Sequence, residues 1–105
     1  MNEVKVRGLT FKDINVSEVS GYSGTDLLFT FQGKRYVFMV ANTNPPMPLN
    51  ILHRFAEQGT CPLCHRMIYP YPTGQQPCLE LKKMDYLLLD AFQKHLSRNV
   101  IPFKK

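Results

Sequence analysis

The sequence has no hydrophobic run long enough to cross a bilayer. Uninterrupted apolar segments such as residues 87–89 are far shorter than the roughly 20 residues that a membrane-spanning helix needs. The N-terminal residues alternate charged with apolar side chains and contain no apolar stretch of signal-peptide length. These absences predict a cytoplasmic protein without a membrane partner.

Cysteine is also scarce. The chain has three cysteines, an odd number, and no visible export signal, which argues against a disulfide framework and favours metal binding or thiol chemistry. Common enzyme signatures are missing: there is no phosphate-binding glycine motif, no Gly-x-Ser-x-Gly elbow and no His-Glu-x-x-His. The sequence therefore favours a binding protein and leaves an enzyme as the weaker alternative.

Size and charge set the remaining bounds. A chain of 105 residues is expected to form a single domain (1–105) around one hydrophobic core. The formal net charge is +5, and the excess belongs to the second half: residues 1–48 carry five basic and four acidic side chains, while residues 49–105 carry eight and four. Such a charge attracts polyanions but does not by itself define a nucleic-acid site.

Residues 27–40 carry the clearest structural pattern. A two-residue type II′ loop at Gly33-Lys34 would pair Phe31 with Tyr36 and place six apolar side chains on one face of a hairpin. The opposite face is apolar away from the loop, which predicts a sheet covered on both sides. The six side chains belong to Leu27, Phe29, Phe31, Tyr36, Phe38 and Val40.

The other segments complete a predicted α+β fold. Alternating residues before the hairpin, with a bend or β-bulge at Gly8 and a second short strand near Ile14, predict an N-terminal antiparallel meander of about four strands over residues 1–40. Residues 41–48 form a proline-rich connector, because proline cannot donate ladder hydrogen bonds. Residues 49–105 follow with a short helix, a cysteine turn and a C-terminal helix.

The spacing of apolar residues predicts the two helices in residues 49–105. Apolar residues three or four apart predict a short helix over about residues 49–58, ended by Gly59. Pro77 suits the first position of a longer amphipathic helix that extends to about residue 98. Its apolar stripe is expected to pack on the sheet.

Cys61-Pro62-Leu63-Cys64 is the strongest chemical signal. Two thiolates two residues apart can reach one ion from a tight turn, and proline presets that turn. Thirteen residues separate Cys64 from Cys78, enough for the chain to fold back and supply a third thiolate at the start of the C-terminal helix. This spacing predicts a zinc-knuckle-like turn around a structural Zn2+.

Three histidines are candidates for the fourth ligand of the zinc ion. His53 is preferred because the chain between it and the cysteine turn can fold back easily. His65 would be strained as a second ligand from the same turn, and His95 would lie about 25 Å from the third cysteine along a straight helix. Water or a carboxylate is a further alternative. The preferred ligands are His53, Cys61, Cys64 and Cys78.

The cysteines also admit interpretations without a metal. Free cysteine is commonly a small buried hydrophobic residue. In addition, Cys-Pro-Leu-Cys-His-Arg resembles the active-site turn of glutaredoxins, which implies a thiol oxidoreductase with Cys61 as nucleophile, in a turn that opens a helix after a buried parallel strand. The flanks differ from that pattern, since residues 49–59 predict a helix before the turn and the prolines after it prevent a long helix.

Basic and aromatic residues surround the cysteine turn. Arg54, Arg66, Tyr69 and Tyr71 offer guanidinium groups for phosphates and rings for bases. We therefore expect a small zinc-stabilised basic binding module that recognises nucleic acid or a nucleic-acid-bound complex. The alternative is a protein-interaction adaptor or inhibitor whose partner protein meets the proline- and tyrosine-rich loops, because rigid prolines reduce the entropy lost on binding.

Overall fold

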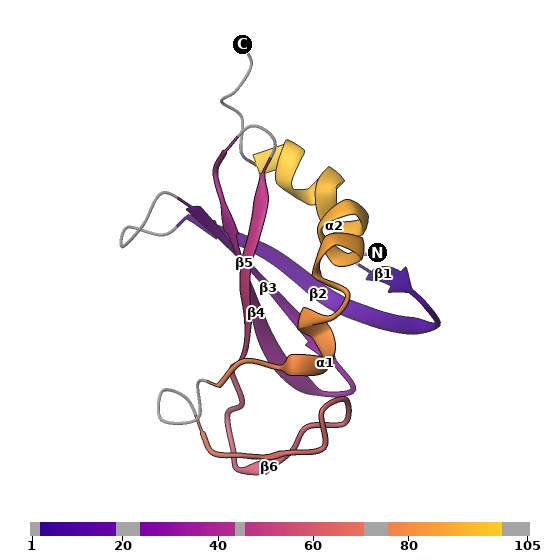
Figure 1. The fold of residues 1–105 in the computed structure, drawn as a ribbon, viewed down its shortest axis with the longest axis vertical. Helices are drawn as coiled ribbons and strands as arrows, with labels where there is room; N and C mark the ends of the chain where they lie inside the picture. Colours follow the sequence, from indigo (N-terminus) through magenta and orange to yellow (C-terminus); the bar gives the residue numbers. More distant parts are fainter. Residues whose placement is uncertain (1–2, 19–23, 44–45, 71–75, 100–105) are drawn as a thin grey trace.

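The computed structural model describes residues 3–18, 24–43, 46–70 and 76–99 (Figure 1). Five strands form one antiparallel sheet in which each strand pairs with its neighbours in sequence. Two C-terminal helices follow, so the α+β class is confirmed. The strands are β1 (Glu3–Val6), β2 (Leu9–Glu18), β3 (Gly24–Phe31), β4 (Lys34–Ala41) and β5 (Met47–His53), and the helices are α1 (Leu79–Lys82) and α2 (Asp85–Asn99).

The loop between β3 and β4 is Gln32-Gly33, not Gly33-Lys34. Both residues have positive φ, 50° and 77°, as a type I′ turn requires. Phe31 therefore pairs with Lys34, and the predicted register was wrong by two residues. Because side chains alternate with a period of two, this shift keeps the same six apolar side chains on one face, and all six are buried.

The first two strands are joined by a tight turn. Arg7 and Gly8 have φ of 52° and 82°, so the bend predicted at Gly8 is a hairpin turn. β2 then continues as a single strand of ten residues where the sequence predicted two. Asp13, with φ of 50°, marks a bulge at which the β2–β3 register shifts.

β5 replaces the helix that the sequence predicted over residues 49–58. Ile51, His53 and Phe55 alternate toward the core and are each at most 2% exposed, which is the pattern of a strand with its extension. The prediction failed because a polar histidine in the inward-facing series concealed the alternation. The sheet thus has five strands instead of four, and the connector predicted over residues 41–48 already enters β5 at Met47.

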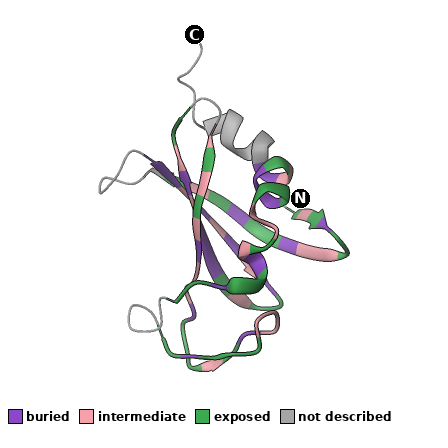
Figure 2. Cartoon of the chain, viewed as in Figure 1, coloured by how far each residue is buried: buried purple, intermediate pink, exposed green. Residues whose placement is uncertain are grey.

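Both helices lie on one face of the sheet, and only this face carries helices in the described part of the chain (Figure 1). The predicted single helix is divided at Lys83 and Met84. Phe92 of α2 contacts the rings of three inward-facing phenylalanines at centroid distances of 5.5–6.3 Å. Buried residues gather where strands and helices face each other (Figure 2). No helix among the described residues has the length and apolar character needed to span a membrane.

Candidate metal centre

The cysteine turn is closed by a small two-stranded ladder. β6 (Gly59–Thr60) and β7 (Met67–Ile68) pair on either side of it, and we call residues 59–68 the knuckle. The amide of Cys61 donates to the carbonyl of Arg66, and the amide of His65 donates to the carbonyl of Cys61, both over 3.0 Å. The knuckle forms the end of the molecule below the sheet in the view of Figure 1.

Backbone amides of the turn are directed at the first cysteine sulfur. The amides of Leu63 and Cys64 donate to Sγ of Cys61 over 3.4 and 3.5 Å. Hydrogen bonds of this kind favour a charged acceptor, here a thiolate. His65 ends the turn with φ of 61°, is exposed to solvent and is not among the four residues whose ligand atoms converge.

Cys78 reaches the knuckle because its segment runs along the edge of β5. The amide of His53 donates to the carbonyl of Gln76 over 2.9 Å, and the amide of Cys78 donates to the carbonyl of Ile51 over 2.8 Å. An isolated bridge between Leu52 and Pro77 lies between these bonds. Cys78 then serves as the residue that precedes α1, as the sequence predicted for the start of its C-terminal helix.

The structure brings together the four residues that the sequence preferred as ligands. Their ligand atoms all lie within 4.8 Å of one another, with Cys61 Sγ 4.0 Å from Cys78 Sγ and Cys64 Sγ 3.4 Å from His53 Nε2. A tetrahedron built on metal–sulfur bonds of about 2.3 Å has S···S edges of about 3.8 Å. The separations are therefore close to those that one metal ion requires.

The histidine ring is oriented by a backbone carbonyl. Nδ1 of His53 donates to the carbonyl oxygen of Gln76 over 2.6 Å, because a carbonyl can only accept. The proton on Nδ1 leaves the Nε2 lone pair facing Cys64 Sγ, which is the tautomer that a metal requires. Phe55 holds the ring edge-to-face at 5.4 Å between centroids. His53 is completely buried, so the carbonyl and the surrounding core fix the ring together.

Tyr36 contacts the cluster from the sheet. Its hydroxyl lies 3.1 Å from Sγ of Cys61. Burial, and then the hydrogen bond to Cys61, raise the pKa of the Tyr36 phenol, so the hydroxyl keeps its proton and donates to the sulfur. The sequence placed Tyr36 on the core face of the hairpin, but nothing in the sequence linked it to the cysteines.

The three thiols differ in acidity because they share one buried site. A hydrogen bond from Cys78 lowers the pKa of Cys61 far below its ordinary value, with His53, the turn amide and Tyr36 adding to this. The hydrogen bond to Cys61, followed by burial, raises the pKa of Cys78, and burial raises that of Cys64. The cluster thus favours one thiolate at Cys61 and suits a cation placed among its sulfurs.

Of the residues proposed for partner binding, Arg66 lies in the knuckle and Tyr69 directly follows it. Arg66 is exposed, Tyr69 is 50% exposed and Arg54 is half-buried, whereas Tyr71 lies outside the described residues. The side chain of His95 is also not among those described. A short antiparallel ladder flanks the cysteine turn, where the resemblance to glutaredoxins implies a parallel strand and a helix.

Comparison with protein-family models, with curated proteins and with solved structures finds no significant match to this chain. The functional argument therefore depends on the geometry of the described residues.

Proposed function

We propose that the protein is a small binding module stabilised by a structural zinc ion held by His53, Cys61, Cys64 and Cys78. The observation that carries this proposal is the convergence of one imidazole nitrogen and three sulfurs within 4.8 Å of one another. Thiolate and imidazole ligands in a tetrahedral set are typical of Zn2+, while carboxylate-preferring Mg2+ and Ca2+ are poorly served by them.

A structural role is favoured over a catalytic one. Four protein ligands complete a tetrahedron and leave no position for a substrate or a reactive water. His53, Cys61 and Cys78 are all completely buried, which limits access further. The ion would tie the end of β5, the knuckle and the start of α1 together, and metal binding of this kind contributes roughly 10 kcal/mol or more in small zinc peptides.

The test is metal analysis of protein purified without chelator or added metal. We expect about one zinc per chain by elemental mass spectrometry, and thiols that react only after chelation. Replacing zinc with Co2+ should give the visible absorption of a tetrahedral thiolate site. Cys64→Ser should weaken this absorption, while His65→Ala, the matched control in the same turn, should preserve it. Metal-free protein with accessible, readily oxidised thiols would support the oxidoreductase alternative instead.

Nucleic-acid binding, which the sequence led us to expect, is our second candidate function. Its support is the exposure of Arg66 and Tyr69 at the knuckle, since a guanidinium and an aromatic ring can contact a phosphate and a base. Labelled oligothymidylate should bind at low salt and be released as salt increases, because counterion release accompanies phosphate contacts. Absence of binding at low salt, or affinity that Arg66→Ala does not change, would reject this function.

A further inference from the structure

The face of the sheet opposite the helices carries an apolar row and a basic row of side chains. Strand pairing aligns its outward-facing side chains in rows that cross the strands. A central row is apolar: Leu28 pairs with Val37, and Val37 pairs with Leu52. The two leucines are half-buried, and Val37 between them is 3% exposed. We call this surface the open face.

A basic row lies beside the apolar one, toward the knuckle end of the sheet. Lys12 pairs with Thr30, Thr30 pairs with Arg35, and the amide of Arg54 donates to the carbonyl of Arg35. Neighbouring strands are about 4.8 Å apart, so the three cations occupy a short span, bordered on β1 by Glu3 opposite Lys12. Lys12 and Arg35 are both exposed on either side of Thr30, so this row carries more positive than negative charge and is complementary to an anionic partner.

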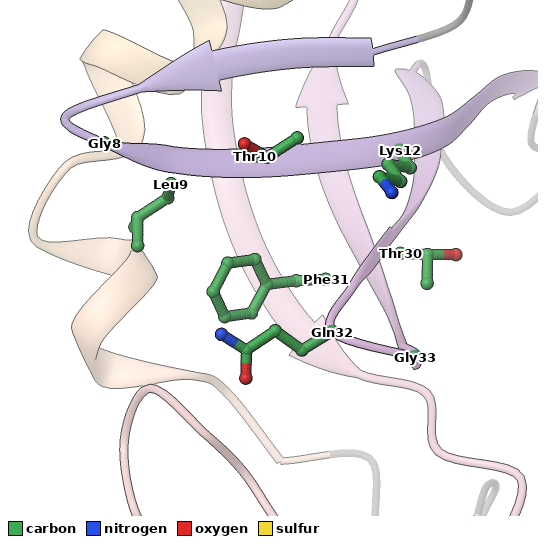
Figure 3. A pocket seen from close by; sticks show the side chains of 8 residues that line it. All are labelled: Gly8, Leu9, Thr10, Lys12, Thr30, Phe31, Gln32 and Gly33. Carbon is green, nitrogen blue, oxygen red and sulfur yellow. The ribbon is translucent and has the colours of Figure 1, made fainter.

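A hollow of about 330 Å³ opens beside Lys12 (Figure 3). It forms because the β2–β3 pairing stops at Lys12 and Thr30, although β2 begins earlier and β3 ends later, and the two strand ends diverge. One ammonium, two threonine hydroxyls and one amide line it beside the apolar side chains of Leu9 and Phe31, and no lining side chain is acidic, so a carboxylate in it can meet the Lys12 ammonium. The lining residues are Gly8, Leu9, Thr10, Lys12, Thr30, Phe31, Gln32 and Gly33.

We propose that the open face binds an acidic, amphipathic segment of a partner protein. Apolar side chains of that segment lie on Leu28 and Leu52, which stay half-exposed on either side of Val37, and its carboxylates meet the basic row, one of them in the hollow. The described outward-facing side chains of this surface are aliphatic, polar or charged, and the Phe31 ring at the hollow is only 4% exposed, so this surface lacks the aromatic platform on which single-stranded nucleic acid stacks. This surface is separate from the metal centre and does not depend on the proposed function.

The test uses the metal-loaded full chain and a fluorescein-labelled helical peptide with leucine on one face and glutamate on the other. We expect binding by fluorescence anisotropy that weakens with salt, and affinity at least tenfold lower for a scrambled peptide of the same composition. Arg35→Glu and Leu28→Thr should each lower the affinity about tenfold. Lys83→Glu changes the net charge as Arg35→Glu does, but Lys83 directly follows α1 at an exposed position away from the open face, so the affinity should be unchanged.

Several results would overturn this proposal. These are no binding of the acidic peptide, equal binding of the scrambled peptide, or an equal loss of affinity in the Lys83→Glu control. Oligothymidylate that binds more tightly than the peptide and is lost with Arg35→Glu would assign the surface to nucleic acid. Circular dichroism and metal content of each variant exclude misfolding as the cause, so failure here is distinct from failure of the zinc proposal.

Discussion

His53 donates a hydrogen bond from Nδ1 to the carbonyl oxygen of Gln76, and the backbone amide of His53 donates to the same oxygen. One carbonyl therefore fixes both the position of this strand residue and the tautomer of its ring. The same segment carries Cys78 two residues later. The contacts that pair this segment with β5 therefore also place the ligands. A metal ion bound there would stabilise the edge of β5.

Loss of an outer-shell partner typically lowers metal affinity about 10- to 100-fold, and removal of the His53 imidazole, a direct ligand, should lower it more. We expect His53→Ala to lower zinc affinity by more than that range in a chelator competition. His53→Cys offers a fourth sulfur and should retain Co2+ with a shifted spectrum. Unchanged affinity in His53→Ala would show that His53 is not a ligand.

Tyr36→Phe removes the hydroxyl that lies 3.1 Å from Cys61 Sγ and keeps the ring in the core. We expect zinc affinity to fall about tenfold, because a buried thiolate loses a donor. The metal-free protein should lose about 1–2 kcal/mol of stability in a urea titration, as expected for a buried hydrogen bond. If Tyr36→Phe lowers stability by this amount but leaves zinc affinity unchanged, the hydroxyl only supports packing.

The acidity of the thiols predicts how metal binding responds to pH. Cys61 has a lowered pKa, whereas Cys64 and Cys78 have raised pKa values and hold protons at neutral pH. Zinc binding should therefore release about two protons per ion, and affinity should decrease as the pH falls. Calorimetry in buffers of different ionisation enthalpy measures this number. Release of three protons would mean that Cys61 is a thiol before the metal binds.

The candidate metal centre could be predicted in part from the sequence. The spacing of Cys61 and Cys64 identifies a turn that brings two sulfurs together, and reach along the chain favours His53 over the other histidines. The contacts of Tyr36 and Gln76 could not be predicted. The first depends on a tertiary contact between the sheet and the knuckle, and the second involves a backbone carbonyl, which has no sequence signature.

Strand β5 is a part of the fold that could not be predicted from the sequence. Ile51, His53 and Phe55 face the core in alternation, but the histidine interrupts the apolar pattern that identifies a strand. His53, which belongs to the candidate metal centre, is thus also the residue that hid strand β5 from the sequence analysis. The hairpin before it was predicted correctly in its faces and wrongly in its register, because hydrophobic alternation specifies a face and the turn residues specify the register.

His65→Gly should stabilise the knuckle. His65 has φ of 61°, in the left-handed region, where a side chain costs roughly 1–2 kcal/mol and glycine costs little. We expect a gain of about 1 kcal/mol in the free energy of unfolding, measured on the metal-free protein, and no change in zinc affinity. A loss of zinc affinity would instead identify His65 as a ligand.

The Gln32-Gly33 loop gives a prediction that depends on backbone conformation alone. A Cβ at Gly33 would meet nothing within 4 Å, so Gly33→Ala tests only the cost of φ at +77°, which should be roughly 1–2 kcal/mol. Gln32→Asn should instead stabilise the hairpin by a few tenths of a kcal/mol, since type I′ turns favour Asn-Gly. Chemical denaturation of both variants measures these changes. Destabilisation by Gln32→Asn would contradict the type I′ loop, because a type II′ loop at Gly33-Lys34 places Gln32 in a strand, where asparagine is disfavoured.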